Sequence, residues 1–334
     1  MPIRLGSIVI ETPVLLAPMA GTTDYPFRRQ AQAFAAPYVV SEMVAGDQLA
    51  RSRRDMVRRA AGAGVVTPLV IQLAGRESRW MQEGARLAED AGADVIDINM
   101  GCPSKMVTNG ASGSALMRDP DHAIRLIEAT VAATTKPVTL KMRLGWNDDM
   151  LNAPEIARRA EAAGVQMVVV HGRTRCQFFR GAANWTAIRR TVEAVRIPVI
   201  ANGDIATIDD AQRALDDSGA AGVMVGRAAQ GRAWLPGAIA AGLRDGRRAE
   251  PPALVAIHAS LAELYRDSLN FYGVELGVRV ARKHIAWAIE ADANHLGDEM
   301  RRAARADICR MTSPDDVYAA LERIFIDADW REAA

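Results

Sequence analysis

The chain has 334 residues, of which 49% are hydrophobic and 24% are charged, and its formal net charge at pH 7 is +1. This composition is typical of a folded protein with a packed core, and it argues against extensive intrinsic disorder. A net charge so near zero provides no overall positive field, so any nucleic-acid partner must be recognised through local clusters of Lys and Arg.

The cysteines and the first residues narrow the class of protein. Cys102, Cys176 and Cys309 are scattered, odd in number and free of CxxC or Cys–His spacing, so we expect neither a disulfide framework nor a metal site. The N-terminus lacks the apolar stretch of a signal peptide, and no apolar run reaches the ~20 residues that cross a bilayer. The sequence therefore predicts a cytoplasmic protein without membrane association.

Eight short segments rich in β-branched residues recur along the chain. They are 13–18, 37–43, 68–74, 93–100, 137–144, 166–172, 198–204 and 222–228. Most are almost continuously apolar, as expected of parallel strands that are covered on both faces. Segments of helical periodicity separate them. The helix predicted over 120–133 begins with a capping Asp119 and Pro120, and the helix over 154–163 ends at Gly164.

This alternation of strand and helix predicts an α/β fold, a (β/α)8 TIM barrel. A doubly wound open sheet is the alternative, but the chain has neither a GxGxxG turn after its first strand nor a GxxxxGK[ST] motif. Residues 244–252 are typical of a linker, and the chain beyond them shows helical periodicity and no strand. We therefore expect a barrel over 1–245 and a small C-terminal all-helical domain over 253–330.

In such a barrel the active site lies at the C-terminal ends of the strands. Taken singly, the polar residues there are ordinary rim or core residues, and only their combination indicates a site. In chain order they are Pro18, Met19, Ala20, Gln72, Asn99, Cys102, Lys141, Arg143, His171, Arg173, Asn202, Gly203, Asp204, Gly226 and Arg227.

Two features of this set indicate a bound anion. Lys141 lies within an otherwise apolar strand, where an unpaired ammonium would be costly, so a bound anion is an economical partner. The turns over 202–204 and 225–231 carry glycines and precede predicted helix starts, a common arrangement for phosphate, and Arg227 adds a cation. Together they predict flavin mononucleotide (FMN) across the barrel mouth, although many barrels bind sugar phosphates in the same way. Lys141 and His171 would stabilise the reduced flavin, and Gln72 could bond its ring edge.

Cys102 follows the fourth strand, between a glycine that lets the backbone turn and a proline that ends the strand. We therefore expect its thiol at the barrel mouth. It could act as a nucleophile, which requires a lowered pKa, or as a general acid, since an unperturbed thiol has a pKa of about 8.5. Adding hydride to one carbon of an activated double bond requires a proton on the other, and this thiol could supply it.

Ten longer motifs span nearly the whole chain. They are APMAGTTDYPFR (17–28), SEM (41–43), IQLAG (71–75), DINMGCPSK (97–105), GSALM (113–117), VTLKMRLGW (138–146), HGRTRCQFFRG (171–181), IPVIANGDI (197–205), VGRAAQGRAW (225–234) and GVRVARKHIAW (277–287). In combination they resemble the tRNA-dihydrouridine synthases, and most closely the bacterial B-type subfamily.

The resemblance implies an FMN-bearing barrel that holds a tRNA together with the helical domain, with NADPH or NADH as reductant. The reduced flavin would pass hydride to C6 of a uracil, and Cys102 would protonate C5 to give 5,6-dihydrouridine. The implied flavin contacts are Pro18, Met19, Ala20, Gln72, Lys141, His171, Asn202, Gly203, Asp204, Gly226 and Arg227. Asn99 is the implied uracil contact, and Arg173, Arg279, Arg282 and Lys283 are assigned to the substrate or tRNA.

Several details of the RNA partner follow less directly. Arg279, Arg282 and Lys283 share a helix face by their spacing, whereas the arginines of 51–59 are either an RNA contact or an ordinary solvated face.

B-type sequences often carry two lysines after the catalytic Cys-Pro, and here Lys105 is followed by Met106, which puts one basic contact in doubt. The B-type is associated with position 17 of the D-loop. We expect a monomer.

Two other functions remain open from the sequence. Dihydroorotate and dihydropyrimidine oxidoreductases also combine FMN barrels with pyrimidine substrates, but a free pyrimidine has no need of the helical domain. An RNA-binding or regulatory protein that lost catalysis could also use this scaffold, and it would carry no flavin.

Overall fold

The computed structural model describes residues 1–104, 108, 111–246 and 251–327. Lys105 and Met106, where the chain departs from the B-type pattern, lie outside the described residues. Part of the predicted linker over 244–252 lies outside them as well. The first residues of that stretch are helical, since α10 (Leu235–Asp245) continues to Asp245 and ends in a left-handed Gly246.

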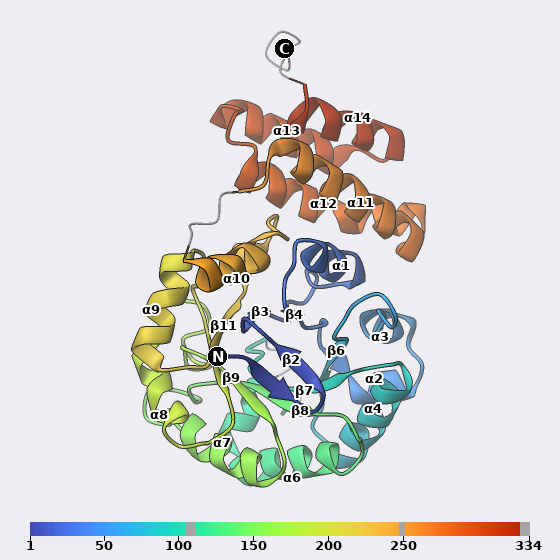
Figure 1. The fold of residues 1–334 in the computed structure, drawn as a ribbon. Coiled ribbons are helices and arrows are strands. Elements are labelled where there is room, and N and C mark those ends of the chain that lie inside the picture. The colour runs from blue at the N-terminus through green and yellow to red at the C-terminus, as the bar shows by residue number, and fades with distance from the viewer. Residues whose placement is uncertain (105–107, 109–110, 247–250, 328–334) are drawn as a thin grey trace.

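A curled parallel sheet forms the centre of the molecule (Figure 1). Its strands are β3 (Val14–Leu16), β4 (Tyr38–Val39), β5 (Val44–Ala45), β6 (Val70–Ala74), β7 (Val95–Met100), β8 (Val138–Arg143), β9 (Met167–His171), β10 (Val199–Asn202) and β11 (Gly222–Val225). They follow the order β4-β3-β11-β10-β9-β8-β7-β6-β5, and a parallel bridge between Val40 and Val70 closes the ring. The predicted barrel is confirmed.

The second strand of the barrel is divided, whereas the sequence predicted a continuous strand over 37–43. Ser41 interrupts the ladder because its Oγ, rather than a backbone carbonyl, accepts the amide of Gln72 at 3.0 Å. Glu42 then turns its carboxylate to the amide of Gly21, with Oε1 2.6 Å from the nitrogen. These side-chain bonds replace strand pairing and leave β4 and β5 as separate short strands.

Helices surround the strands, as expected of parallel strands buried on both faces. They are α1 (Tyr25–Ala33), α2 (Gly46–Ala50), α3 (Arg54–Arg59), α4 (Ser78–Asp90), α6 (Pro120–Val131), α7 (Ala153–Ala162), α8 (Arg189–Val192), α9 (Ile208–Ser218) and α10. Short 3-10 helices η1 (Gly113–Arg118), η2 (Thr186–Ile188) and η3 (Arg227–Ala229) complete the loops. The predicted cap is present, since the amide of His122 donates to the Asp119 carboxylate at 2.9 Å.

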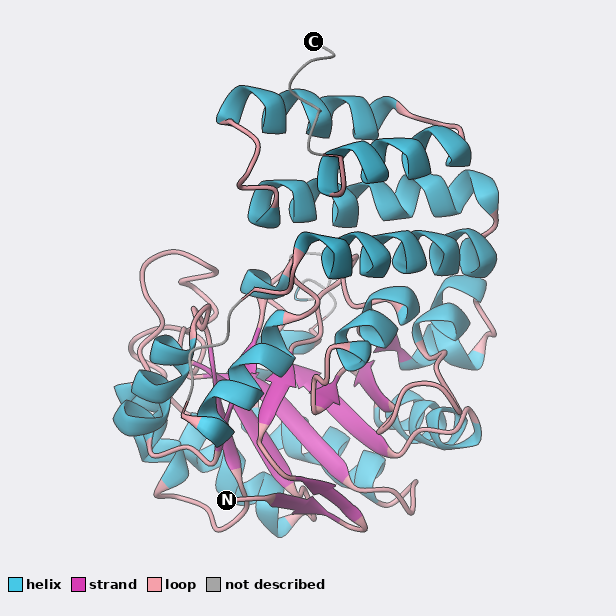
Figure 2. Ribbon diagram, turned by 45° about the horizontal axis from the view of Figure 1, so that its top comes forward, coloured by secondary structure: helices cyan, strands magenta, loops and turns pink. Residues whose placement is uncertain are grey.

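An N-terminal hairpin that the sequence reading did not predict closes one end of the barrel. Its strands are β1 (Ile3–Leu5) and β2 (Ile8–Ile10), which pair antiparallel. Ile3, Leu5 and Ile10 pack into the same cluster as buried residues of the barrel interior such as Val95 and Met167. Figure 2 shows the hairpin at the end of the barrel away from the C-terminal helices.

The C-terminal region is entirely helical within its described residues, as predicted. It comprises α11 (Leu254–Tyr272), α12 (Val274–Asp292), α13 (Asp298–Arg310) and α14 (Pro314–Phe325). These helices enclose a core of their own, with buried side chains such as Leu261, Tyr265, Ile285, Ile308 and Leu321. None of the helices in the described part of the chain has the length and apolar character needed to span a bilayer.

Charged side chains join the helical region to the barrel. Arg29 of α1 pairs with both Glu263 and Asp267 of α11. Asp292 at the end of α12 accepts from Arg232 Nε at 3.0 Å and from the Trp234 indole at 2.9 Å. Arg29 thus holds α11 against α1, which lies beside it in Figure 1, and Asp292 ties the end of α12 to the residues just before α10.

Candidate active site

A cavity of about 730 Å³ opens at the C-terminal ends of the barrel strands. This volume is in the usual range of cofactor sites, ~300–1,000 Å³. Asn99 and Cys102 line it, and so do all the residues predicted to bind the flavin. These are Pro18, Met19, Ala20, Gln72, Lys141, His171, Asn202, Gly203, Asp204, Gly226 and Arg227.

Lys141 is a buried cation that forms no ion pair within the described part of the chain. Its Nζ donates to Asn202 Oδ1 at 2.8 Å, and Asn202 Nδ2 donates in turn to the carbonyl of Met224 at 2.8 Å. Burial lowers the pKa of Lys141 to about 8. Since an ammonium carries three N–H donors, Lys141 keeps donors for a ligand, and an acceptor-rich or anionic group fits beside it.

His171 is held as a neutral imidazole with a defined tautomer. Arg173 Nη1 lies 3.2 Å from His171 Nε2, and a guanidinium can only donate, so Nε2 accepts and the proton resides on Nδ1. Burial, together with the nearby charges of Lys141 and Arg143, keeps the pKa of His171 well below its ordinary value. His171 therefore provides the cavity with a neutral N–H donor.

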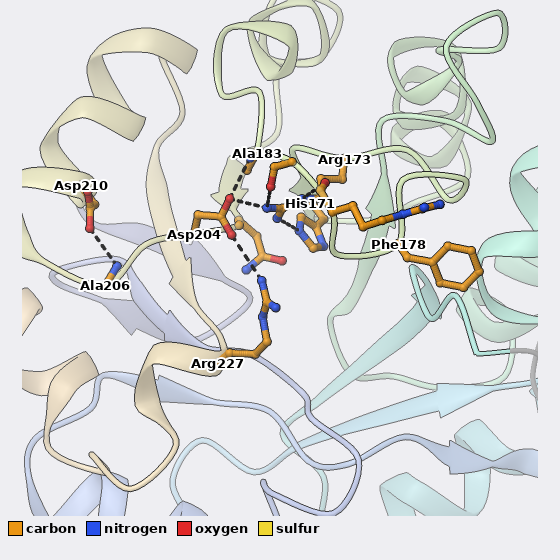
Figure 3. Close-up of polar contacts among 12 residues, drawn as sticks. His171, Arg173, Phe178, Ala183, Asp204, Ala206, Asp210 and Arg227 are labelled. Atoms are coloured by element: carbon orange, nitrogen blue, oxygen red, sulfur yellow. Dashed lines mark hydrogen bonds and ion pairs between the residues drawn. The ribbon is translucent and has the colours of Figure 1, made fainter. Parts of the chain in front are cut away.

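Asp204 connects two arginines at the cavity wall (Figure 3). Its carboxylate accepts from Arg173 Nη2, from the amide of Ala183 at 2.8 Å and from Arg227 Nη2 at 3.4 Å. Burial raises the pKa of Asp204, but the bonds from Arg173 and Ala183 outweigh it, and the pKa lies below its ordinary value. Arg173, predicted as a substrate contact, is buried and holds Asp204 and His171, whereas Arg227 is exposed at the entrance.

Gly203 is required by the close packing of this wall. Its φ is +117°, and a Cβ there would lie 2.7 Å from the Cβ of Ala183 and 2.8 Å from His171 Cδ2. The Gly203 carbonyl accepts from the Trp185 indole at 2.9 Å. The glycine thus allows the His171 ring to lie directly against the backbone of the turn over 202–204.

The backbone of Cys102 is fixed on both sides, and its thiol has no disulfide partner. The Cys102 amide donates to Asn99 Oδ1 at 3.1 Å, while its carbonyl accepts from Ser114 Oγ at 2.8 Å. The residue is half-buried and lines the cavity. The predicted position of the thiol at the barrel mouth agrees with this arrangement.

Arg143 joins the Cys102 turn to the loop after β9. Its Nε donates to the carbonyl of Gly101 at 2.8 Å, and its Nη1 donates to the carbonyls of Thr174 at 2.9 Å and Phe178 at 2.8 Å. Burial lowers the pKa of Arg143 to about 10. A guanidinium that serves three carbonyls at once fixes the relative position of the two loops.

Two aromatic side chains that the sequence reading did not select also line the cavity, Phe178 and Phe179. Phe179 is 50% exposed, and its ring centroid lies 5.5 Å from the Arg143 guanidinium carbon and 4.9 Å from that of Arg227. Such pairs of an aromatic face and a cation are typical of sites that accept a flat ring. The two consecutive phenylalanines in the motif HGRTRCQFFRG could have indicated these residues from the sequence.

The predicted basic face of α12 is divided in the structure. Arg279 is exposed, with Nη2 3.8 Å from Glu275 Oε1. Arg282 is half-buried and donates to the carbonyl of Met311 at 2.6 Å, so its guanidinium serves the contact between helices rather than a shared exposed face. Of these two arginines, Arg279 is the exposed one.

Lys283 lies where α12 meets the loop after β3. Its Nζ is 3.9 Å from the position that a Cβ on Gly21 would occupy. Within the same junction, Tyr272 OH donates to Asp24 Oδ2 at 3.0 Å. Burial raises the pKa of Asp24, while the bond from Tyr272 and the charge of Lys283 lower it. The helical region therefore contacts the loop that brings Met19 to the cavity.

Three of the arginines of 51–59 contact defined partners. Arg53 pairs with Asp55 at 3.1 Å, and Arg59 donates to the carbonyl of Met43 at 2.9 Å. Arg58 lies over the Tyr272 ring, 5.2 Å from its centroid. This segment is thus tied to the cavity rim and to α11.

Comparison with known proteins agrees with the motifs. The family model described as "Dihydrouridine synthase (Dus)" matches residues 15–323. A "Probable tRNA-dihydrouridine synthase" of Rhodobacter capsulatus is 52% identical over 100% of both chains. A "tRNA-dihydrouridine synthase B" of Xanthomonas campestris is 42% identical over 97% of this chain and 96% of its own.

Solved structures share the fold at low sequence identity. Morphinone reductase in complex with tetrahydroNAD matches 77% of this chain and 93% of its own, with a TM-score of 0.51 and 14% identity. A 6-hydroxypseudooxynicotine amine oxidase from Pseudomonas geniculata matches 79% and 52%, with a TM-score of 0.57 and 13% identity. The family match, in contrast, extends over both the barrel and the helices, and the chain belongs to the dihydrouridine synthases, flavin-dependent oxidoreductases that act on uridine in tRNA.

Proposed function

We propose that this protein reduces the C5=C6 bond of a uridine in the D-loop of tRNA, with FMN as cofactor and NADPH or NADH as reductant. The observation that carries the proposal is the free Cys102 thiol on the wall of the same cavity as Lys141 and His171. An acid and a set of ring-binding donors in one cavity are what the reduction of a conjugated double bond requires.

The residues of the cavity fit FMN. Lys141 offers free N–H donors without an anionic partner among the described residues, and His171 offers a neutral N–H. Gly203, Gly226 and Arg227 would hold the phosphate at the turns after β10 and β11, where η3 begins. Pro18, Met19, Ala20, Gln72, Asn202 and Asp204 complete the proposed contacts. When bound, the flavin supplies the hydride for C6 of the uracil.

Cys102 would then act as the general acid. Its thiol donates a proton to C5 of the uracil, and its backbone is held by Asn99 and Ser114 while it does so. Asn99 keeps one amide N–H beyond the one it gives to Gln72, and we assign that donor to the uracil. The side chains of Phe178 and Phe179, which line the cavity, would cover the bound base.

The uracil must leave its stack in the tRNA before it can enter the cavity. We propose that residues 1–245 are the catalytic barrel and that 253–330 form the domain that orients the tRNA. Arg279 and Lys283 would contact phosphates, and Arg282 would support them through its bond to Met311. The resemblance to the B-type subfamily leads us to propose position 17 of the D-loop, and one relative is named tRNA-dihydrouridine synthase B. We expect a cytoplasmic monomer that needs no metal.

Replacing Cys102 by Ala tests this function. We expect C102A to retain its flavin and yellow colour and to form dihydrouridine in tRNA at least roughly 100-fold more slowly than the wild type, the usual scale of removing a general acid. Mass spectrometry of tRNA digests measures the product. Wild-type rates in C102A would refute the role of the thiol, and wild-type reduction of free uridine but not of tRNA would refute the RNA substrate.

A further inference from the structure

A chain of side-chain hydrogen bonds runs from the barrel interior to the backbone of Cys102. The amides of Gly101 and Cys102 donate to Asn99 Oδ1 at 3.3 and 3.1 Å. Asn99 Nδ2 donates to Gln72 Oε1 at 2.7 Å, and Gln72 Nε2 donates to Asp97 Oδ2 at 2.7 Å. Three steps therefore connect a buried carboxyl group to the turn that carries the thiol, and the last step consists of two parallel hydrogen bonds.

The amides of Gly101 and Cys102 determine which group donates and which accepts in every hydrogen bond of this series. A peptide N–H can only donate, so Asn99 must turn its oxygen toward Cys102 and its NH2 group toward Gln72. Gln72 must then present its oxygen to Asn99 and its NH2 group to Asp97. Asp97 is left as an acceptor at Oδ2 whatever its protonation state, and only a side chain that can accept there completes the chain.

The sheet register places these side chains in a row. Gln72 of β6 pairs with Asp97 of β7, and Asp97 pairs with Thr139 of β8. Thr139 Oγ1 donates to the other carboxyl oxygen of Asp97 at 2.6 Å. Asp97 is 3% exposed and Gln72 is 1% exposed, so neither group can exchange its partner for bulk water. An unpaired group here would be costly.

We propose that Asp97 is a positioning residue that acts through Gln72 and Asn99 to set the location of the Cys102 thiol at the cavity. The proposal rests on the proposed function of Cys102 as proton donor. A proton donor that is displaced by about 1 Å can lose a factor of roughly 100 in rate, so the orientation of two buried amides controls the reaction from inside the barrel.

Two substitutions of Asp97 separate this role from bulk packing. Asn at 97 can turn its oxygen to Gln72 and its NH2 group to Thr139, whose hydroxyl can accept, so D97N preserves the chain. Leu at 97 has a similar shape and no acceptor, so D97L leaves the Gln72 NH2 group unpaired and frees both amides to reorient. D97N is thus the matched control for D97L, because it keeps the hydrogen bonds that D97L removes.

The first measurement is the rate at which iodoacetamide alkylates Cys102 in the flavin-loaded protein. Peptide mass spectrometry distinguishes Cys102 from the exposed Cys176 and Cys309. We expect a rate near wild type in D97N and an increase of about tenfold in D97L, since release of the turn exposes the half-buried thiol. We also expect kcat for tRNA to fall roughly 10- to 100-fold in D97L with little change in KM.

Two further variants make the result specific. Thr139→Val removes the bond to the other oxygen of Asp97 and leaves the path to Cys102 intact, so its alkylation rate should stay near wild type. Gln72→Met cuts the path one link closer to the thiol without opening a cavity. It should reproduce the Cys102 alkylation rate of D97L once flavin occupancy is matched, since Gln72 is itself a proposed flavin contact, and it serves as the test if D97L does not fold.

An unchanged alkylation rate of Cys102 in D97L or Q72M would overturn the proposal, and so would an equal increase in T139V. A kcat loss explained by loss of flavin from D97L would overturn it as well. The role of Cys102 is tested separately. If C102A were fully active while D97L still increased the alkylation rate, the proton-donor function would fail and the positioning of the turn by Asp97 would stand.

Discussion

Arg173 donates to His171 Nε2 at 3.2 Å and binds the Asp204 carboxylate through a second nitrogen of the same guanidinium. One buried arginine therefore sets the tautomer of the cavity histidine and also anchors the turn proposed to hold a phosphate. The two sides of the cavity are coupled through this side chain, and its removal should affect both.

We expect Arg173→Gln to raise the pKa of His171, because one of the cations that depress it is removed. The protein should also lose about 2–3 kcal/mol of unfolding free energy, less than for a fully buried pair, since Asp204 is partly exposed. Histidine side-chain NMR over a pH series and urea unfolding measure the two effects. Arg180→Gln, at an exposed neighbouring position, is the control. An unmoved His171 titration in R173Q would contradict the assignment.

The buried Lys141 makes the stability of the flavin-free protein depend on pH. Its pKa of about 8 lies below the value near 10.4 of an unfolded lysine, so the unfolded chain binds more protons between these pH values. The destabilising effect of Lys141 is therefore fully present below pH 8 and diminishes as the pH rises toward 10.4.

Lys141→Met should accordingly be more stable than the wild type at pH 7 when both lack flavin. The difference should be on the order of 1–3 kcal/mol, given about 1.4 kcal/mol for each pKa unit and the lost bond to Asn202. Urea unfolding at pH 7, 8 and 9.5 measures it, with Lys136→Met as the control. A difference that stays constant over this range would contradict the low pKa.

Removing the exposed aromatic ring at the entrance should impair catalysis on tRNA. We expect Phe179→Ala to lower kcat/KM for tRNA about tenfold, because stacking of one base on an aromatic ring contributes roughly 1–3 kcal/mol. Flavin content, read from the visible absorbance, should stay near wild type. Met150→Ala, an exposed apolar residue outside the cavity, is the matched control. Equal kinetics of F179A and M150A would argue against base stacking at this position.

The division of the basic face of α12 predicts different effects for its residues. Arg279→Ala and Lys283→Ala should weaken tRNA binding and each reduce the slope of log K against log salt by about 1, as expected for a lost phosphate contact. Arg282→Ala should mainly lower the unfolding free energy of the helical region, because it loses its bond to Met311. Filter binding at several salt concentrations and thermal unfolding test these expectations. A larger salt effect in R282A than in R279A would reverse the assignment.

The residues at the strand ends were predictable because parallel strands bring their carboxyl ends to one edge, whatever the loops between them do. Lys141, His171 and Asn202 therefore lie around one cavity as expected from chain order alone. The direction of a side chain on a helix was less predictable. The spacing of Arg282 relative to Arg279 is compatible with an exposed face. In the structure, however, the Arg282 guanidinium donates to the carbonyl of Met311, 29 residues away.

Three kinds of feature needed the structure itself. The hairpin of β1 and β2 has strands too short for a periodic pattern to indicate them. Phe178 has a φ of +54°, and this backbone conformation in the loop after β9 cannot be inferred from a strand or helix pattern. The role of Asp97 depends on the directions of two amides, which follow from hydrogen-bond partners on separate strands.

The N-terminal hairpin limits the routes into the barrel. Ile3, Leu5 and Ile10 fill the far end of a barrel whose interior is already packed, so the described residues leave the cavity at the carboxyl ends of the strands as the place where reactants can enter. Under the proposed function, the nicotinamide reductant and the uracil would therefore both have to use this mouth of the barrel.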